Sequence, residues 1–141
     1  MLFFPAAGKV NISFFKRGSM PNLEINPWDR YINIYKALSD TTRLKIMWLL
    51  LSMDSKINVS EIIYVLGENQ YNISKHLKIL KNADLIYEKR DGKWTFYHYR
   101  TNDADFEAKI RQSVMSIPKK LMKEEILRCK ERLATRGNET A

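Results

Sequence analysis

The spacing of apolar residues predicts four helices in the first half of the chain. The first begins at Asn26-Pro27, an N-cap followed by proline at the first helical position, and the second begins behind Asp40. Both then repeat apolar residues every three or four positions, at Trp28, Tyr31, Ile32, Tyr35 and Leu38 and again at Leu44, Met47, Trp48 and Leu51.

The third and fourth helices are separated by only a few residues. Asn58 with Glu61 three positions later is a variant of the capping box, and Gly67 ends that helix early. Asn69 caps the next helix, whose inward stripe is Ile73, Leu77 and Leu80. Two helices joined by so short a turn indicate a helix-turn-helix.

After Leu85 the period changes from 3.6 to 2, which predicts a β-hairpin around Asp91-Gly92. A turn at these two residues pairs Arg90 with Lys93. It also sets three further pairs, Lys89 with Trp94, Tyr87 with Phe96 and Leu85 with His98. We expect the buried face to hold Leu85, Tyr87, Trp94 and Phe96, with His98 as a packing histidine.

Two more helices follow the hairpin. Phe106, Ile110 and Val114 lie on one side of a helix from Asp103 to Val114, and Pro118 starts a last helix with the stripe Met122, Ile126, Cys129 and Leu133. The order predicts a mainly α fold with a β-hairpin wing, a winged helix-turn-helix with additional N- and C-terminal helices. Residues 26–136 form this domain, between a flexible tail at 1–25 and a polar tail at 137–141. Residues 1–19 are open to two interpretations, a native tail or a segment before a true start at Met20.

The composition fits one globular domain. The chain has 141 residues, of which 45% are hydrophobic and 28% charged, too few for two independent cores. No apolar run approaches the roughly 18 residues of a membrane span. We find no glycine-rich phosphate loop, nucleophile elbow or carboxylate pair beside a histidine, so we expect neither an enzyme nor a cofactor. The single cysteine, Cys129, excludes an intrachain disulfide and fits the reducing cytoplasm.

The positive charge is concentrated in one stretch. The net charge is +8, and residues 69–100 carry seven Lys and Arg against three Asp and Glu, which is half of the surplus. Opposite the inward stripe of the fourth helix stand polar and cationic side chains suited to reading a DNA major groove. The candidate DNA-contacting residues of this helix are Gln70, Tyr71, Asn72, Ser74, Lys75, His76 and Lys78.

The hairpin tip carries three cations, Lys89, Arg90 and Lys93. Such a tip is suited to contacting DNA phosphates, which fix register without reading sequence. The alternative for both cationic surfaces is a solvated face that keeps the protein soluble, and a winged helix can also serve as a protein–protein interaction module. Such modules usually lose the cations that this chain keeps.

Several ordered motifs resemble the ArsR/SmtB winged-helix repressors. Residues 35–46 read YKALSDTTRLKI, similar to the family opening FKALSDPTRLRIL, and residues 72–80 read NISKHLKIL, similar to the recognition helix TVSRHLKVL. ADLI at 83–86 and DGKWTFY at 91–97 resemble the AGLV and EGRWVYY of the family wing. The resemblance covers about half of the chain and implies a homodimeric repressor that binds a double-stranded DNA operator, with terminal helices at the dimer interface. At the position of His76, relatives tend to contact the DNA backbone.

The chain departs from the family where metals bind. Relatives that sense metals carry Cys-x-Cys in the motif ELCVCEL, whereas this chain has Asn58 and Ser60 at those positions. An amide and a hydroxyl do not replace thiolates toward Zn, Cd or As. Residues 119–136 hold neither Asp nor His, which the dimer-interface metal sites of relatives need. We therefore expect no metal site, and the inducer is unknown.

The candidate dimer-interface residues lie on the first and last helices and are Trp28, Tyr31, Tyr35, Met122, Ile126, Cys129 and Leu133. Trp28, Tyr31 and Tyr35 are also a candidate pocket for an organic ligand. For Cys129 two roles stay open, a buried apolar side chain or a symmetric disulfide between two subunits.

Overall fold

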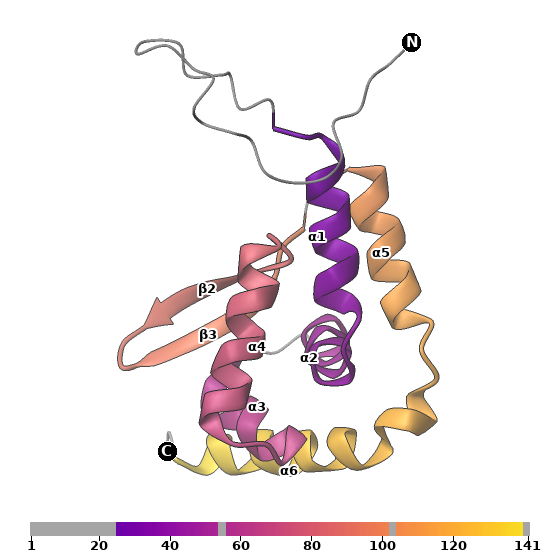
Figure 1. The fold of residues 1–141 in the computed structure, drawn as a ribbon. Coiled ribbons are helices and arrows are strands. Elements are labelled where there is room, and N and C mark those ends of the chain that lie inside the picture. The colour runs from indigo at the N-terminus through magenta and orange to yellow at the C-terminus, as the bar shows by residue number, and fades with distance from the viewer. Residues whose placement is uncertain (1–24, 54–55, 102–103, 140–141) are drawn as a thin grey trace, which may run out of the picture.

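The computed structural model describes residues 25–53, 56–101 and 104–139 (Figure 1). The tail expected at residues 1–24 lies outside this part of the chain. The elements, in chain order, are α1 (Trp28–Leu38), α2 (Thr41–Ser52), β1 (Ile57–Asn58), α3 (Val59–Leu66), α4 (Gln70–Asn82), β2 (Ile86–Asp91), β3 (Trp94–Tyr99), α5 (Asp105–Met115), the 3-10 helix η2 (Lys119–Met122) and α6 (Lys123–Glu139).

The expected starts of α2, α3 and α4 are confirmed by capping hydrogen bonds, whereas α1 begins at Trp28 behind Pro27, and a 3-10 helix follows Pro118 before α6 starts at Lys123. Asp40 Oδ1 accepts from the Arg43 N–H at 3.0 Å, and Asn69 Oδ1 accepts from the Asn72 N–H at 2.9 Å. At α3 the capping box is complete, because Asn58 and Glu61 each accept the other's backbone N–H. Gly67 ends α3 with a φ of +66°, a left-handed conformation that glycine adopts without steric cost.

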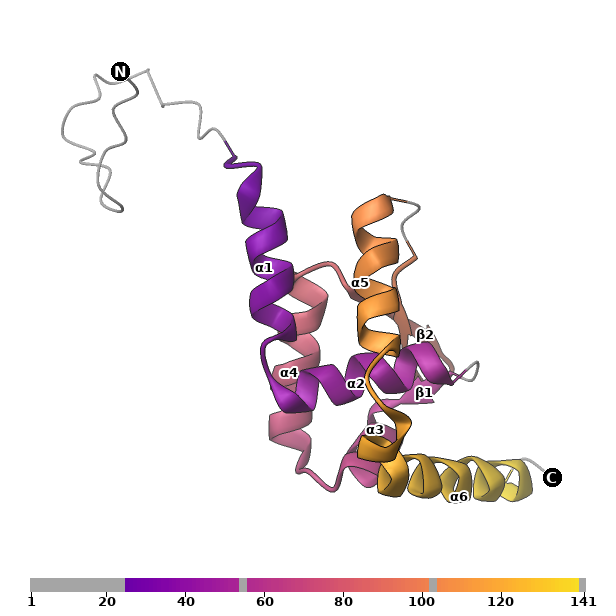
Figure 2. The same ribbon diagram turned by 90° about the vertical axis from the view of Figure 1, so that its right-hand side faces the viewer.

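Helix α2 is the centre of the fold. Its residues Ile46, Met47, Trp48 and Leu49 are consecutive and all buried, so the helix is covered on nearly every side. The sequence pattern had suggested one apolar stripe, but Leu44 and Leu51 of that stripe are only partly buried. Figure 2 shows α2 running below α5, with α3 beneath α2, while α4 runs past α2 and contacts both α1 and α2.

The hairpin forms as expected, but its turn lies one residue later, so each strand partner shifts by two residues and Arg90 pairs with Thr95 instead of Lys93. Asp91 pairs with Trp94, so the turn consists of Gly92 and Lys93 rather than Asp91 and Gly92. Gly92 has a φ of +60°, and Lys93 is not among the described residues with positive φ. Positive φ at the first central position alone is what a type II′ turn requires, which explains why glycine stands there.

The side chains that are buried in the hairpin differ in part from those expected. Ile86 is fully buried at 0% exposure, whereas Tyr87 and Trp94 are 39% and 42% exposed, so the buried face expected from the sequence was wrong for these two aromatics. His98 lies opposite Tyr87, not Leu85, and stacks on its ring at 5.2 Å. A third strand, β1, pairs with β3 and completes a sheet in the order β1-β3-β2.

The last helix packs on the same chain. Met122 and Cys129 are 3% and 2% exposed, and α6 runs across α3 at the base of the fold (Figure 1). Two ion pairs fix it: Lys45 Nζ of α2 lies 2.6 Å from Glu125 Oε1, and Arg136 pairs with Glu61 of α3. The helix continues to Glu139, into the segment from 137 that the sequence suggested was a polar tail.

Together these elements form the expected fold, a mainly helical winged helix-turn-helix with a β-hairpin wing. No helix in the described part of the chain combines the length and hydrophobicity needed to cross a lipid bilayer.

The Glu125–Lys45 pair leads to a prediction about acid stability. Burial raises the pKa of Glu125, but the hydrogen bond and charge of Lys45 outweigh it and hold the pKa below the ordinary 4.5. A carboxyl with a lowered folded-state pKa stabilises the fold above its unfolded pKa and loses that contribution as pH falls through the folded pKa. We expect Glu125→Gln to lower the free energy of unfolding at pH 7 by about 1–3 kcal/mol. Because the variant lacks the titrating carboxyl, its free energy of unfolding should fall less than that of the parent when the pH is lowered below about 4.5.

Urea unfolding followed by circular dichroism at pH 7 and at pH 3.5 measures both effects. Glu124→Gln is the matched control, because Glu124 is exposed on the same helix. If the free energy of unfolding falls between pH 7 and pH 3.5 by the same amount in Glu125→Gln as in the parent, the proposed contribution of the Glu125–Lys45 pair is contradicted.

Candidate nucleic-acid interface

The exposed side of α4 carries most of the polar residues that the sequence singled out. Tyr71 is 77% exposed, and Gln70, Asn72, Ser74, Lys75 and Lys78 are exposed as well. The opposite side of the helix is anchored by Ile73, Leu77 and Leu80, each no more than 2% exposed. Helix α4 therefore presents hydroxyl, amide and ammonium groups to solvent from a rigid support.

His76 differs from the other α4 candidates because it is bonded within the protein. Arg43 Nη1 lies 3.1 Å from His76 Nδ1, within hydrogen-bond distance, and Asp40 Oδ1 lies 3.7 Å from the same ring nitrogen. Arg43 also donates through Nε to the Ala37 carbonyl at 2.5 Å and through Nη2 to the Lys36 carbonyl at 3.3 Å. One guanidinium thus joins the end of α1 to α4.

No sequence pattern predicts this link, because Arg43 and His76 are far apart in the chain. The contact with Arg43 leaves the His76 ring mostly buried, with its side chain 17% exposed. The role of His76 that the geometry supports directly is to hold α4 against α1 and α2.

The turn before α4 is held in a similar way. Thr42 of α2 donates its hydroxyl to Glu68 Oε1 at 2.6 Å, so the helix-turn-helix is tied to the central helix. With Asn69 as N-cap, the first turn of α4 is fixed from both sides.

The hairpin is tied to the far end of α4. Lys81 Nζ lies 2.9 Å from Glu88 Oε1, and the Tyr97 hydroxyl donates to Glu88 Oε2 at 3.2 Å. The hydrogen bond from Lys81 lowers the pKa of Glu88, while burial and the Glu88 carboxylate raise the pKa of Tyr97. The carboxylate is therefore charged at neutral pH and holds the hairpin at a fixed angle to α4.

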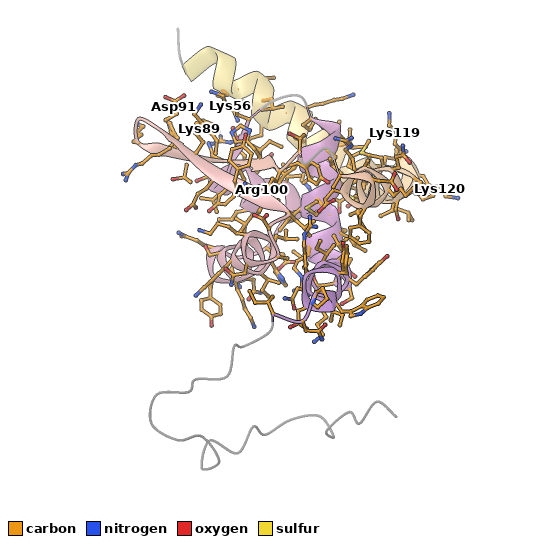
Figure 3. All side chains as sticks on the ribbon, turned by 90° about the horizontal axis from the view of Figure 1, so that it is seen from above. Lys56, Lys89, Asp91, Arg100, Lys119 and Lys120 are labelled. Atoms are coloured by element: carbon orange, nitrogen blue, oxygen red, sulfur yellow. The ribbon has the colours of Figure 1, made fainter. Side chains whose placement is uncertain are left out.

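All three cations of the hairpin tip are exposed, namely Lys89, Arg90 and Lys93. Lys89 and Arg90 are neighbours in β2, so their side chains leave opposite faces of the strand. Figure 3 shows Lys89 near Lys56 and Asp91 on one side of the molecule, with Lys119 and Lys120 on the opposite side. Lys56 pairs with Asp91 at 3.6 Å, so part of the charge at the tip is neutralised.

His98 is also close to these cations, but it is not charged. Burial lowers its pKa, and the charges of Lys56 and Lys89 lower it further. Its ring is stacked on Tyr87, and the Arg100 guanidinium lies 5.6 Å from the centre of the same tyrosine ring. These contacts fit the packing role expected of His98.

The residues considered for a dimer interface fall into two groups. On α1, Trp28 and Tyr35 are 69% and 59% exposed, and both Tyr31 and Tyr35 pack edge-on against Phe106 of α5. At the C-terminal end of the chain, Met122 of η2 and Cys129 of α6 are buried in their own subunit, and Ile126 and Leu133 of α6 are partly buried. Met122 and Cys129 are thus packed within the chain, whereas a role of Ile126 and Leu133 between subunits stays a prediction.

The same burial removes one of the two roles considered for Cys129. Burial raises the pKa of its thiol, and the nearby Glu61 carboxylate raises it further. A symmetric disulfide would require α6 to leave α3, so the structure supports Cys129 as a small core residue.

The metal positions of relatives are occupied differently here. Asn58 Oδ1 is engaged in the α3 capping box, and Ser60 is exposed. In the residues that the structure describes, no three side chains of His, Cys, Asp or Glu lie together as metal ligands would.

Comparison with known proteins places this geometry in context. The model for bacterial regulatory proteins of the arsR family matches residues 40–88, from the cap of α2 into β2. An arsenical resistance operon repressor of Escherichia coli K12 is 35% identical over 79 residues, which are 56% of this chain and 67% of the relative. A protein of the same description from Bacillus subtilis 168 is 32% identical over 91 residues, which are 64% of this chain and 84% of the relative.

Among solved structures, a homodimeric winged helix-turn-helix DNA-binding domain from Mycobacterium bovis, a possible ArsR-family regulator, has a TM-score of 0.56 at 23% identity. The match covers 71% of this chain and 88% of that domain. At this identity the likeness concerns the fold. The matches agree with the motifs of the helix-turn-helix and wing.

Proposed function

Because the chain belongs to the ArsR family of bacterial regulatory proteins, we propose that it is a homodimeric repressor that binds a specific DNA operator. Its relatives are named as transcriptional regulators, and the chain is a DNA-binding regulator rather than an enzyme. It acts where the operator is, in the cytoplasm.

The observation that carries the proposal is the exposed face of α4. Gln70, Tyr71 and Asn72 stand exposed in its first turn, and Lys75 and Lys78 follow one and two turns later on the exposed side. Amide groups can form paired hydrogen bonds with adenine, and lysine reaches guanine or phosphate. The first turns of the second helix are the part of a helix-turn-helix that enters the major groove.

The hairpin supports the proposal with phosphate contacts. Lys89, Arg90 and Lys93 extend beyond the end of α4, and the Lys81–Glu88 pair fixes their direction. Cations that lie beyond the end of the recognition helix are suited to contacting the phosphates of the DNA backbone beside the groove.

Two copies would associate through α1 and α5. Trp28, Ile32 and Tyr35 follow at helical spacing on α1 and are all exposed, and Ile25 extends the same stripe at 88% exposure. Such a row of exposed apolar side chains marks an interaction surface. Figures 1 and 2 show α5 beside α1, so both helices can take part. A two-fold dimer places its two α4 helices in successive major grooves of one operator.

We further propose that this repressor does not respond to metal through the sites of its relatives. Asn58 and Ser60 replace the two thiolates, and residues 119–136 contain neither Asp nor His.

The first experiment is fluorescence anisotropy with DNA from upstream of the gene and with scrambled DNA of equal length. A repressor prefers the native fragment and saturates at two chains per site. Equal, weak and strongly salt-dependent binding to both would instead favour a protein–protein interaction module.

Base reading by α4 is tested with Gln70→Ala and Tyr71→Ala. Each should weaken operator binding by about 1–3 kcal/mol and leave binding to scrambled DNA unchanged, because base contacts act on the specific complex only. The same anisotropy titrations measure both affinities. Equal losses on the two DNAs would contradict a base-reading role.

The wing is tested with Arg90→Ala. We expect weaker binding to every sequence, with the slope of log K against log salt reduced by about one for each arginine lost. Lys120→Ala is the matched control, since it removes a cation on the opposite side of the molecule. A slope equal to that of the parent would remove the wing from the contacts.

The dimer surface is tested with Trp28→Ser and Tyr35→Ser. Loss of a central aromatic should raise the dimer dissociation constant at least about tenfold, as measured by analytical ultracentrifugation. Leu127→Ser, which changes a 59% exposed apolar residue on α6, should have no effect. The reverse result would place the interface on α6.

A further inference from the structure

A cleft of about 380 Å³ lies between the hairpin and the last turns of α6. Lys93, Trp94 and Phe96 line it from the hairpin, and Arg132 and Arg136 line it from α6. Its floor is formed at the start of α3, by Asn58 and Glu61. Its volume falls in the usual range of small-ligand sites, roughly 300–1,000 Å³. Figure 3 shows α6 and the hairpin on the same side of the molecule.

The one acid that lines the cleft is already satisfied. Glu61 is 3% exposed, and its Oε2 accepts from the Asn58 N–H at 2.9 Å while its Oε1 accepts from Arg136 Nε at 2.6 Å. Arg136 also donates through Nη2 to the Lys56 carbonyl at 2.9 Å. The Glu61 and Arg136 charges therefore compensate each other.

Two cations in the cleft keep their charge available. Among the described residues, neither the Lys93 ammonium nor the Arg132 guanidinium has a hydrogen bond or an ion pair. Arg132 is half-buried at the wall of the cleft. A carboxylate satisfies a guanidinium with two parallel hydrogen bonds.

The hairpin adds an aromatic surface beside these cations. Trp94 is 42% exposed, and its ring lies 5.1 Å from the Lys93 ammonium. Phe96 is 9% exposed, and the Arg136 guanidinium lies 5.7 Å from the centre of its ring. A partly exposed indole that lines a cleft can stack against another planar ring.

We propose that this cleft binds a small aromatic carboxylate, with its ring against Trp94 and its carboxylate on Arg132 and Lys93. Such a ligand bridges α6 and the wing. Resting on the proposed function, a consequence follows for DNA: Lys93 is one of the wing cations, so the carboxylate competes with a DNA phosphate for it. The ligand then weakens operator binding and acts as an inducer.

The test uses the full chain without DNA and benzoate as the probe, with benzamide as its neutral isostere. Titration followed by ¹⁵N NMR should shift the Trp94 indole signal with benzoate and require at least tenfold more benzamide. Arg132→Ala should weaken benzoate binding at least tenfold. Lys130→Ala, which removes an exposed cation from the same helix, should leave it unchanged.

Equal affinity for the two probes, or full benzoate binding by Arg132→Ala, overturns the proposal. If benzoate does not bind while Arg132→Ala weakens binding to all DNA, the cleft is part of the phosphate contacts, which also overturns it. Benzoate binding is measured without DNA, so the two proposals can fail separately. If the protein binds benzoate but no operator, the proposed function is contradicted while the ligand site is supported.

Discussion

The burial of helix α2 is the constraint on which the other elements depend. Four consecutive residues, Ile46–Leu49, are buried, and a helix that is apolar on nearly all sides must be surrounded. Packing α1, α3, α4, α5 and β3 around it leaves only their outer faces for function. The outer face of α4 is polar and cationic, whereas that of α1 is aromatic. One of these faces can therefore meet DNA while the other meets a second copy.

A few charged side chains set the angles between these elements. Arg43 joins the end of α1 to His76 of α4, and the Lys81–Glu88 pair joins α4 to the hairpin. Both connections are local hydrogen bonds to a charged group, which are stronger than neutral ones and more directional than apolar contact. The geometry of the α4 and wing surface is thus held by polar contacts at its two ends, over a core that provides the stability.

Helix α6 gives this chain a feature beyond the region matched by the family, residues 40–88. It uses its apolar stripe within the subunit, and its Arg136 reaches the capping box of α3 and the ring of Phe96. The wing is consequently bordered by α6, and a ligand bound in the cleft between them would contact the hairpin cation Lys93. A regulator without thiolates at the usual metal positions gains a different place at which a small molecule can act.

The sequence by itself determined the elements, the helix caps, the polar face of α4 and the family resemblance, because these depend on local backbone chemistry and side-chain period. It misplaced the hairpin turn by one residue, since Asp91-Gly92 and Gly92-Lys93 are both acceptable turns locally. In the register that the structure shows, β3 also pairs with β1, and Ile86 is buried in the core. It also assigned Met122 and Cys129 to a second subunit, because an apolar stripe shows that a face is buried but not against what. Only the tertiary structure decided that α3 covers this stripe, that Arg43 reaches His76, and that Arg132 and Trp94 share a cleft, since these contacts join residues far apart in the chain.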